Sequence, residues 1–222
     1  MINVSIDKSL SQLIPELTLG IVHSQIHVSK HDDQLWKEID QCVSKISSSC
    51  AIDSLYNVRG IKALRDGYKA IGKDPSRYRG SAEALARRII QGKGLYKVNT
   101  IVDINNLVSL ESMHSVGSYD LSRISQPISF RIGGQGESYK GIGKDIINIA
   151  ELPVFADASG PFGSPTSDSE RAMITESTKD LMMVVISFTG KESLEKHTDR
   201  IVNLLTRYAG ATKDQIETLI VQ

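Results

Sequence analysis

The spacing of apolar residues along the chain follows two different periods, and each predicts a different kind of element. In several stretches apolar residues recur at every third or fourth position, which places them on one face of a helix. Helices are therefore expected at residues 32–46, 58–71, 82–91, 100–112 and 191–208, and a short one from Thr212, where Thr212 and Gln215 form a capping-box pattern. Alternating or continuous apolar residues predict strands at residues 2–6, 17–28, 128–132, 149–156 and 181–188.

The helix expected at residues 100–112 carries two asparagines in its interior, where asparagine is a poor helix former. Asn105 shares a face with Ser109, which predicts a solvated amide. Asn106 lies between Val102 and Leu110 at spacings of four, so its amide is expected to point towards the core. A half-buried amide needs partners, and Asn106 is therefore interpreted either as a structural strut or as a ligand-binding group.

Two segments after this helix are interpreted as irregular. Residues 115–120 contain Gly117 and predict a turn followed by the pair Tyr119-Asp120. Residues 159–171 are rich in serine, glycine and proline and predict a long polar loop, a type that often forms lids or binding loops.

Length and composition favour a globular protein. The chain has 222 residues, of which 40% are hydrophobic, and we expect one domain over residues 1–222. No apolar run approaches the ~20 residues that span a membrane, and the N-terminus lacks the pattern of a signal peptide. A cytoplasmic location is therefore expected. Cys42 and Cys50, eight positions apart near one expected helix, are interpreted as small buried side chains.

Charge is unevenly distributed, although the net charge is zero. Residues 59–97 hold eleven Lys or Arg and three acids, which predicts a surface that binds a polyanion such as RNA. A solvated basic face is the alternative interpretation. The expected contact residues are Lys62, Arg65, Lys69, Arg77, Arg79, Arg87 and Arg88.

The sequence shows none of the common catalytic or cofactor motifs. Its five histidines have no third ligand at a spacing typical of metal sites, so no metal is expected. The glycines of residues 133–143 do not match the spacing of a phosphate-binding loop, and hairpin turns account for them better. No cofactor is expected.

Three stretches, SAEALARR, GKGLYKVNTIVDINN and YDLSRI, resemble the tRNA-editing domain of the bacterial phenylalanyl-tRNA synthetase β subunit, its modules B three and B four. The similarity covers about residues 57–188 and extends to single-domain relatives of that module. It implies an α+β fold, a mixed barrel-like sheet with helices around it, and the acceptor end of tRNA as partner. In that family the module hydrolyses the ester of mischarged tRNA with a positioned water and no metal.

Carrying the family's site over residue by residue places its helix asparagine on Asn106 and its aromatic–Asp pair on Tyr119-Asp120. The family's active-site histidine then falls on Gly117, and its glutamate near Ser169 or Glu170. The resemblance therefore implies Asn106 and Glu170 as catalytic residues. It implies substrate binding by Gly117, Ser118, Tyr119, Ser169 and Arg171.

Two functions follow from the resemblance as alternatives. The first is a freestanding aminoacyl-tRNA deacylase, and the second is a non-catalytic module that binds RNA or an amino-acid-like ligand. The retained Asn106 allows the first, and Gly117 in place of histidine favours the second. In either case we expect a pocket where the Asn106 helix, residues 117–119 and residues 164–171 meet.

Overall fold

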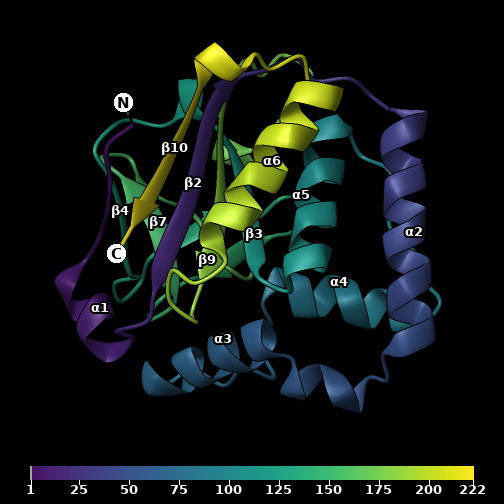
Figure 1. Cartoon of the computed structure of the whole chain (residues 1–222). Coiled ribbons are helices and arrows are strands. Elements are labelled where there is room, and N and C mark those ends of the chain that lie inside the picture. Colours follow the sequence, from purple (N-terminus) through teal and green to yellow (C-terminus); the bar gives the residue numbers. More distant parts are fainter. Residues whose placement is uncertain (1) are drawn as a thin grey trace.

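The computed structural model describes residues 2–222 and arranges them in three layers, two β-sheets and a layer of helices (Figure 1). The outer sheet, sheet A, has the order β1-β4-β7-β8, with β1 parallel to β4 and the other pairs antiparallel. Its strands are β1 (Val4–Ile6), β4 (Ile128–Ile132), β7 (Pro153–Asp157) and β8 (Gly160–Gly163). A separate hairpin pairs β5 (Ser138–Lys140) with β6 (Ile146–Asn148).

The middle layer, sheet B, is antiparallel throughout and has the order β10-β2-β9-β3. Its strands are β2 (Thr18–Gln25), β3 (Ser115–Asp120), β9 (Asp180–Ser187) and β10 (Ile216–Val221). The central strand β9 is apolar on both faces. Met182 and Val184 point to sheet A and Met183 and Val185 to the helices, as the continuous apolar run predicts.

The helices cover the other face of sheet B and one end of the molecule (Figure 1). Helices α2, α5 and α6 form the third layer, α3 and α4 lie across its end, and α1 lies beside sheet A. Their bounds are α1 Lys8–Leu13, α2 Asp33–Ser49, α3 Arg59–Ala70, α4 Ser81–Ile90, α5 Thr100–Ser112 and α6 Leu194–Tyr208. Short 3-10 turns occur at Asp53–Asn57, Leu121–Arg123, Glu170–Ala172 and Lys213–Gln215.

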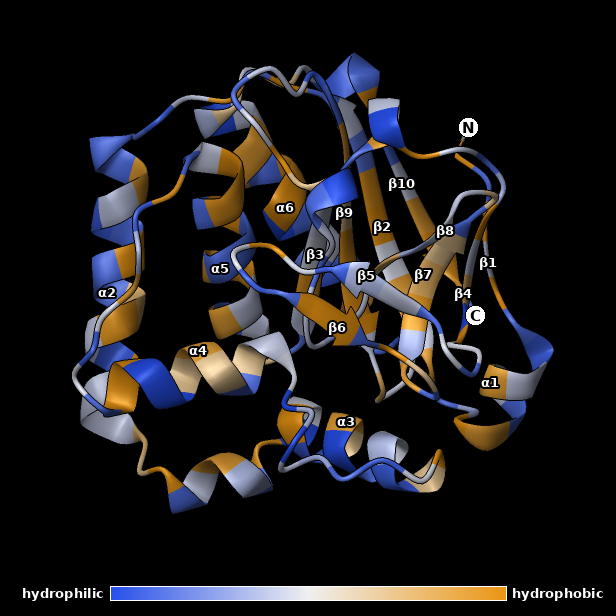
Figure 2. Ribbon diagram, turned by 180° about the vertical axis from the view of Figure 1, so that it is seen from behind, coloured by the Kyte–Doolittle hydropathy of each residue, from blue (hydrophilic) through white to orange (hydrophobic). Residues whose placement is uncertain are grey.

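Local sequence explains where several helices begin and end. The Asp32 carboxylate accepts hydrogen bonds from the backbone N–H groups of Gln34 and Leu35 at the start of α2. Asn99 accepts one from Val102 at the start of α5, and asparagine is among the residues favoured at this position. Apolar residues are concentrated where sheet and helices face each other (Figure 2), because burial of those faces stabilises all three layers.

The structure confirms the α+β class and corrects four expectations. The two packed sheets stay open, so the sheet is not closed into a barrel. Residues 115–120 form the strand β3 and not a turn. Residues 216–221 form the strand β10 instead of a helix, because their apolar side chains pair along β2. The segment 159–171 is partly ordered as β8 and a 3-10 turn.

Within residues 2–222, no helix is long and apolar enough to cross a membrane.

Candidate functional site

Strand β3 divides the predicted site residues into two groups, because neighbouring side chains of a strand point to opposite faces. Val116 packs in the core between sheet B and the helices, whereas Tyr119 packs in the core between the two sheets. Ser118 therefore faces α5, and Gly117 faces sheet A. The predicted residues of α5 and those of residues 164–171 consequently approach β3 from opposite faces.

On the helix face, two neighbouring amides of α5 lie half-buried. The Ser118 hydroxyl donates a hydrogen bond of 2.8 Å to Oδ1 of Asn105, which leaves the N–H donors of Asn105 for another partner. Asn106 is also half-buried, and in the part of the chain that the structure describes its amide has no protein hydrogen-bond partner. The expectation of a solvated face is wrong, because Asn105 bonds β3 and Ser109 is fully buried and donates to the carbonyl of His114.

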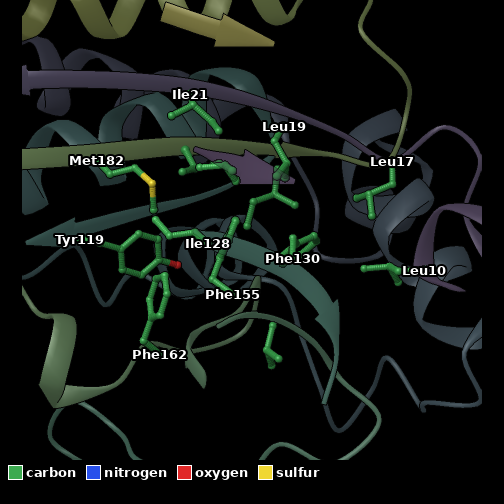
Figure 3. Close-up of a cluster of buried hydrophobic side chains, with 14 of the residues drawn as sticks. Leu10, Leu17, Leu19, Ile21, Tyr119, Ile128, Phe130, Phe155, Phe162 and Met182 are labelled. Atoms are coloured by element: carbon green, nitrogen blue, oxygen red, sulfur yellow. The ribbon is translucent and has the colours of Figure 1, made fainter. Parts of the chain in front are cut away.

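On the opposite face, the ring of Tyr119 covers the two glycines beside it. A Cβ atom on Gly117 would lie 2.7 Å from Cζ of Tyr119, and one on Gly163 would lie 2.5 Å from its Cε1. The ring also packs against Phe155 and Phe162, with centroids 5.6 and 5.1 Å apart (Figure 3). No larger residue, and hence no histidine, fits at position 117 while Tyr119 keeps this place.

Three tyrosine hydroxyls from three elements hold residues 164–168. Tyr119 of β3 donates to Oδ1 of Asp168 over 2.8 Å. The Tyr68 hydroxyl of α3 is 2.8 Å from the hydroxyl oxygen of Thr166, and Tyr139 of β5 donates to the carbonyl of Ser167 over 2.8 Å. Since all three rings are buried, this segment is fixed to the core.

Asp168 is the most perturbed carboxyl group at this site. Burial raises the pKa of Asp168 to about 7, and the hydrogen bond from Tyr119 only partly offsets it. Burial and the neighbouring Asp168 raise the pKa of Tyr119 well above its usual value, so the phenol stays protonated and donates. No pattern in the sequence singled out Asp168 because its partner lies 49 positions earlier in the chain.

The remaining predicted site residues of this segment are held by other groups. Glu170 pairs with Lys140, with Oε2 and Nζ 3.0 Å apart. Arg171 donates two hydrogen bonds of 2.9 Å to the buried Asp157 and a third to the carbonyl of Gly160. Arg171 is thus a structural cation in this structure. Ser169 is buried, and its Oγ is the one fully buried side-chain polar atom of residues 2–222 that lacks a hydrogen-bond partner.

Most of the residues expected to bind RNA already have partners. Lys62 and Lys69 pair with Asp66, and Arg65 and Arg79 pair with the buried Glu83. Four cations share two carboxylates in these pairs, so the pairs neutralise only part of the positive charge and support the alternative of a solvated face in part.

The α4 cations are bound without a carboxylate. Arg87 donates to the Tyr56 hydroxyl over 3.0 Å. Arg88 donates to the carbonyls of Gly94 and Lys93 and lies 4.0 Å from the centroid of the exposed Tyr96 ring. Arg77 is exposed. Unneutralised positive charge therefore remains at Arg77, Arg87 and Arg88.

Comparison with known protein families shows which family the chain belongs to. The model of the B3/4 domain family matches residues 63–210. The chain belongs to the B3/4 domain family. The match includes α5, β3 and residues 164–171, so the candidate site residues of these three segments are part of the B3/4 domain.

A solved structure supports the same relationship at the level of the fold. It is an N-terminal fragment of the phenylalanyl-tRNA synthetase β-subunit from Pyrococcus horikoshii, with a TM-score of 0.50 and 15% sequence identity. The match covers 98% of this chain and 54% of that fragment, so this chain spans about half its length. A comparison with curated proteins gives no match. The resemblance seen in the sequence is thus confirmed for family and fold.

The residues on the helix face of β3 offer amides and hydroxyls. Among residues 2–222 no group of three or more His, Cys, Asp or Glu side chains could hold a metal ion. Asn105, Asn106 and Ser118 can orient a polar ligand such as an ester. Asp168, whose pKa is raised by burial, lies half-buried on the other side of β3 and accepts the hydrogen bond from Tyr119.

Proposed function

We propose that this B3/4 protein hydrolyses the ester of mischarged aminoacyl-tRNA. The observation that carries the proposal is the pair of half-buried amides on α5, one bonded to Ser118 and one without a protein partner. Unsatisfied amide donors in a partly desolvated site are suited to a carbonyl oxygen that becomes negative in the transition state. The B3/4 family and the shared fold with part of a phenylalanyl-tRNA synthetase β-subunit support tRNA as the substrate class.

In the proposed reaction, a water oxygen attacks the ester carbonyl carbon. The bond between that carbon and the ribose oxygen breaks, and the products are a free amino acid and a tRNA hydroxyl group. The Asn106 amide donates to the carbonyl oxygen as it gains charge. Asn105, held by Ser118, orients the substrate. Catalysis in such a site comes from positioning and from hydrogen bonds that strengthen in the transition state.

One observation favours a second candidate function, binding of an acceptor end or an amino-acid-like ligand without hydrolysis. Tyr119 covers Gly117, the position at which the resemblance places the family's histidine. A site without that histidine, and with Asp168 bonded to Tyr119 on the other face of β3, has fewer groups for proton transfer. A deacylation screen of the purified protein against misacylated tRNAs separates the two functions. Release of an amino acid supports the deacylase, and tight binding without release supports the binding module.

Replacing Asn106 by alanine is expected to lower single-turnover deacylation by roughly 10²–10³-fold, the usual effect of removing one oxyanion donor. Thermal unfolding should change little, because Asn106 has no protein partner to lose. Asn203→Ala, at an exposed position of α6, is the matched control. Normal hydrolysis combined with a lower melting temperature would show that Asn106 is a structural strut.

Binding of tRNA is expected to weaken as salt rises, because each phosphate neutralised adds ~0.7–0.9 to the slope of log affinity against log salt. The double variant Arg87→Ala, Arg88→Ala should reduce that slope by about 1–2. The variant Lys62→Ala, Lys69→Ala removes the same charge from side chains that already pair with Asp66, so it should change the slope less. Filter binding or fluorescence anisotropy measures both slopes, and equal slopes for the two double variants would contradict a role for the α4 cations.

A further inference from the structure

A hollow of about 220 Å³ lies where three helix ends meet, away from Asn106 and Asp168. The start of α3 contributes Arg59 and Gly60, the residues at and after the end of α5 contribute Met113 and His114, and the start of α6 contributes His197. Thr189, Glu192, Ser193, Val58 and Ser112 complete the lining. None of the functions considered above uses this hollow.

His114 has the properties of a ligand-binding side chain in this hollow. It is only 8% exposed, and within residues 2–222 its ring nitrogens have no hydrogen-bond partner. Its Nδ1 faces the first turn of α3 at a point where a Cβ on Gly60 would lie 3.2 Å away. The ring nitrogens are not among the fully buried polar atoms of residues 2–222 that lack a partner, so they remain accessible from the hollow, and a ligand that enters it can bond to them.

A second imidazole lies against the first. The rings of His114 and His197 meet edge to face, with centroids 5.6 Å apart. Burial lowers the pKa of His114 to about 4, helped by the nearby His197 and Arg59, and burial and Lys196 lower the pKa of His197. Both rings are therefore neutral at pH 7, and each can donate one N–H. The lowered pKa values show that the surroundings of the two rings disfavour positive charge. A bound anion would favour it and would therefore raise both pKa values.

The two helix starts at the hollow add donors. Neither Val58 at the start of α3 nor Ser193 at the start of α6 caps its helix with a side chain. Each start therefore has backbone N–H groups without an intrahelical acceptor, and the positive ends of both helix dipoles lie at the hollow. Helices of 12 and 15 residues are long enough for this arrangement to favour an anion.

The charged side chains at the rim have opposite signs. Arg59 pairs with Glu192 over 2.9 Å, and both side chains are about 70% exposed. An exposed ion pair of this kind contributes little to stability. A bound anion can therefore replace Glu192 as the partner of the Arg59 guanidinium. The other charged groups near the two imidazoles are Lys196 and Glu111.

We propose that this hollow binds a phosphate group through His114, His197, Arg59 and the starts of α3 and α6. The volume holds a phosphate and a few waters, each water occupying ~30 Å³. A neighbouring hollow of about 540 Å³ shares Arg59 and Thr189 with it and is otherwise lined by Asn57, Lys62 and Ala63 and by the two acids Glu16 and Asp66. The rest of a phosphorylated molecule has room there. This inference does not depend on ester hydrolysis.

Proton NMR of the imidazole signals, with inorganic phosphate as the probe and chloride at matched ionic strength as reference, tests the proposal. Phosphate should shift the signals of His114 and His197 and raise the pKa of both rings, with a dissociation constant in the millimolar range, about −4 kcal/mol. His27 is exposed and lies two residues after the end of β2. Its signal should not respond to phosphate. Absence of a phosphate-dependent shift at His114 and His197 would overturn the proposal, as would a response to Zn²⁺ alone.

Two variants with opposite expected effects make the test independent of folding. His114→Asn should weaken phosphate binding about tenfold or more, the loss of one hydrogen bond to a charged group. Glu192→Gln keeps the shape of an exposed side chain and removes the competitor for Arg59, so it should tighten binding several-fold. His27→Asn is the matched control and should bind like the wild type. If Glu192→Gln and His114→Asn both bind like the wild type, the site is elsewhere.

The source of the phosphate is distinguished by a second probe. A short oligoribonucleotide with a 5′-phosphate is compared with the same oligonucleotide ending in a 5′-hydroxyl. A shift of His114 at lower concentration for the phosphorylated RNA than for inorganic phosphate assigns the site to a nucleic-acid phosphate. A shift with inorganic phosphate alone assigns it to a small phosphate compound. If His114 responds to none of the three probes, the proposed phosphate site is contradicted. This outcome is independent of whether the protein is a deacylase.

Discussion

Replacing Asp168 by asparagine is expected to stabilise the protein at pH 8 by about 2–4 kcal/mol and to change its stability little at pH 3. The pKa of Asp168 is raised from 3.8 to about 7 in the folded state. Between these two values the folded state holds a proton that the unfolded chain has released. The stability that this group contributes is fully present below pH 4 and is lost as the pH rises to about 7.

Asparagine is a suitable replacement because its side-chain oxygen can accept the same hydrogen bond from Tyr119, and it has no proton to lose. His114 changes stability in the opposite direction. Its pKa is lowered from 6.5 to about 4, so its contribution is present above pH 6.5 and is lost as the pH falls towards 4. The two effects oppose each other in the wild type, and Asp168→Asn should expose the rise of stability from pH 4 to 6.5 that His114 causes.

Urea unfolding of wild type and variant at several pH values measures this difference. Charged groups common to both proteins cancel in the comparison. A variant that is less stable than the wild type at pH 8 would show that surrounding donors stabilise the Asp168 carboxylate in the folded state, contrary to its raised pKa.

Replacing Arg171 by methionine is expected to destabilise the protein by ~3–5 kcal/mol, the usual effect of removing one partner of a buried ion pair. The Asp157 side chain is completely buried, and Arg171 donates to both of its oxygens. Without the guanidinium, Asp157 loses the largest charge that holds its pKa below the usual value. The variant also loses the contact between the guanidinium and the Phe162 ring, in which Cζ of Arg171 lies 5.5 Å from the ring centroid.

The double variant Arg171→Met, Asp157→Asn should recover part of that loss, because it leaves no uncompensated charge. Arg123→Met, at a cation about half exposed that pairs with Asp120 at 3.8 Å, serves as a control and should cost less than ~1 kcal/mol. If Arg171→Met instead leaves stability unchanged and reduces ligand binding, Arg171 is the substrate-binding residue that the family resemblance implies.

Helices and the buried central strand could be predicted because their signals are local. The caps of α2 and α5 and the apolar run of β9 depend on a few neighbouring residues. Strand β3 could not be predicted because Gly117 suggests a turn, and the reason for that glycine is the ring of Tyr119 lying over it. The sequence after Thr212 predicts a helix and not the strand β10, because only pairing with β2, nearly 200 positions earlier, makes these residues a strand.

The same limit applies to the candidate site. The half-buried position of Asn106 could be predicted from the spacing of its apolar neighbours, and its role as a site residue stays a prediction from the family resemblance. The roles of Arg171 and Tyr119 in the core, and the existence of the Asp168 pair, depend on contacts between β3, β8 and residues 164–171. Such contacts join residues that no periodicity relates, and a sequence alone does not show which side chains the fold has already satisfied.

The position of β2 also affects how this chain can fold during synthesis. β2 is made from residues 18–25, yet its two neighbours are β9 and β10, from residues 180–187 and 216–221. On the ribosome both edges of this apolar strand stay unpaired until β9 has been made, about 160 residues later, and one edge stays unpaired until β10 has been made, almost 200 residues later. At ~5–20 residues per second the longer interval lasts at least about ten seconds. Helices α3, α4 and α5 can form from local contacts in that interval, whereas sheet B completes last. Nascent chains that stop before β10 should therefore be the most aggregation-prone form of this protein.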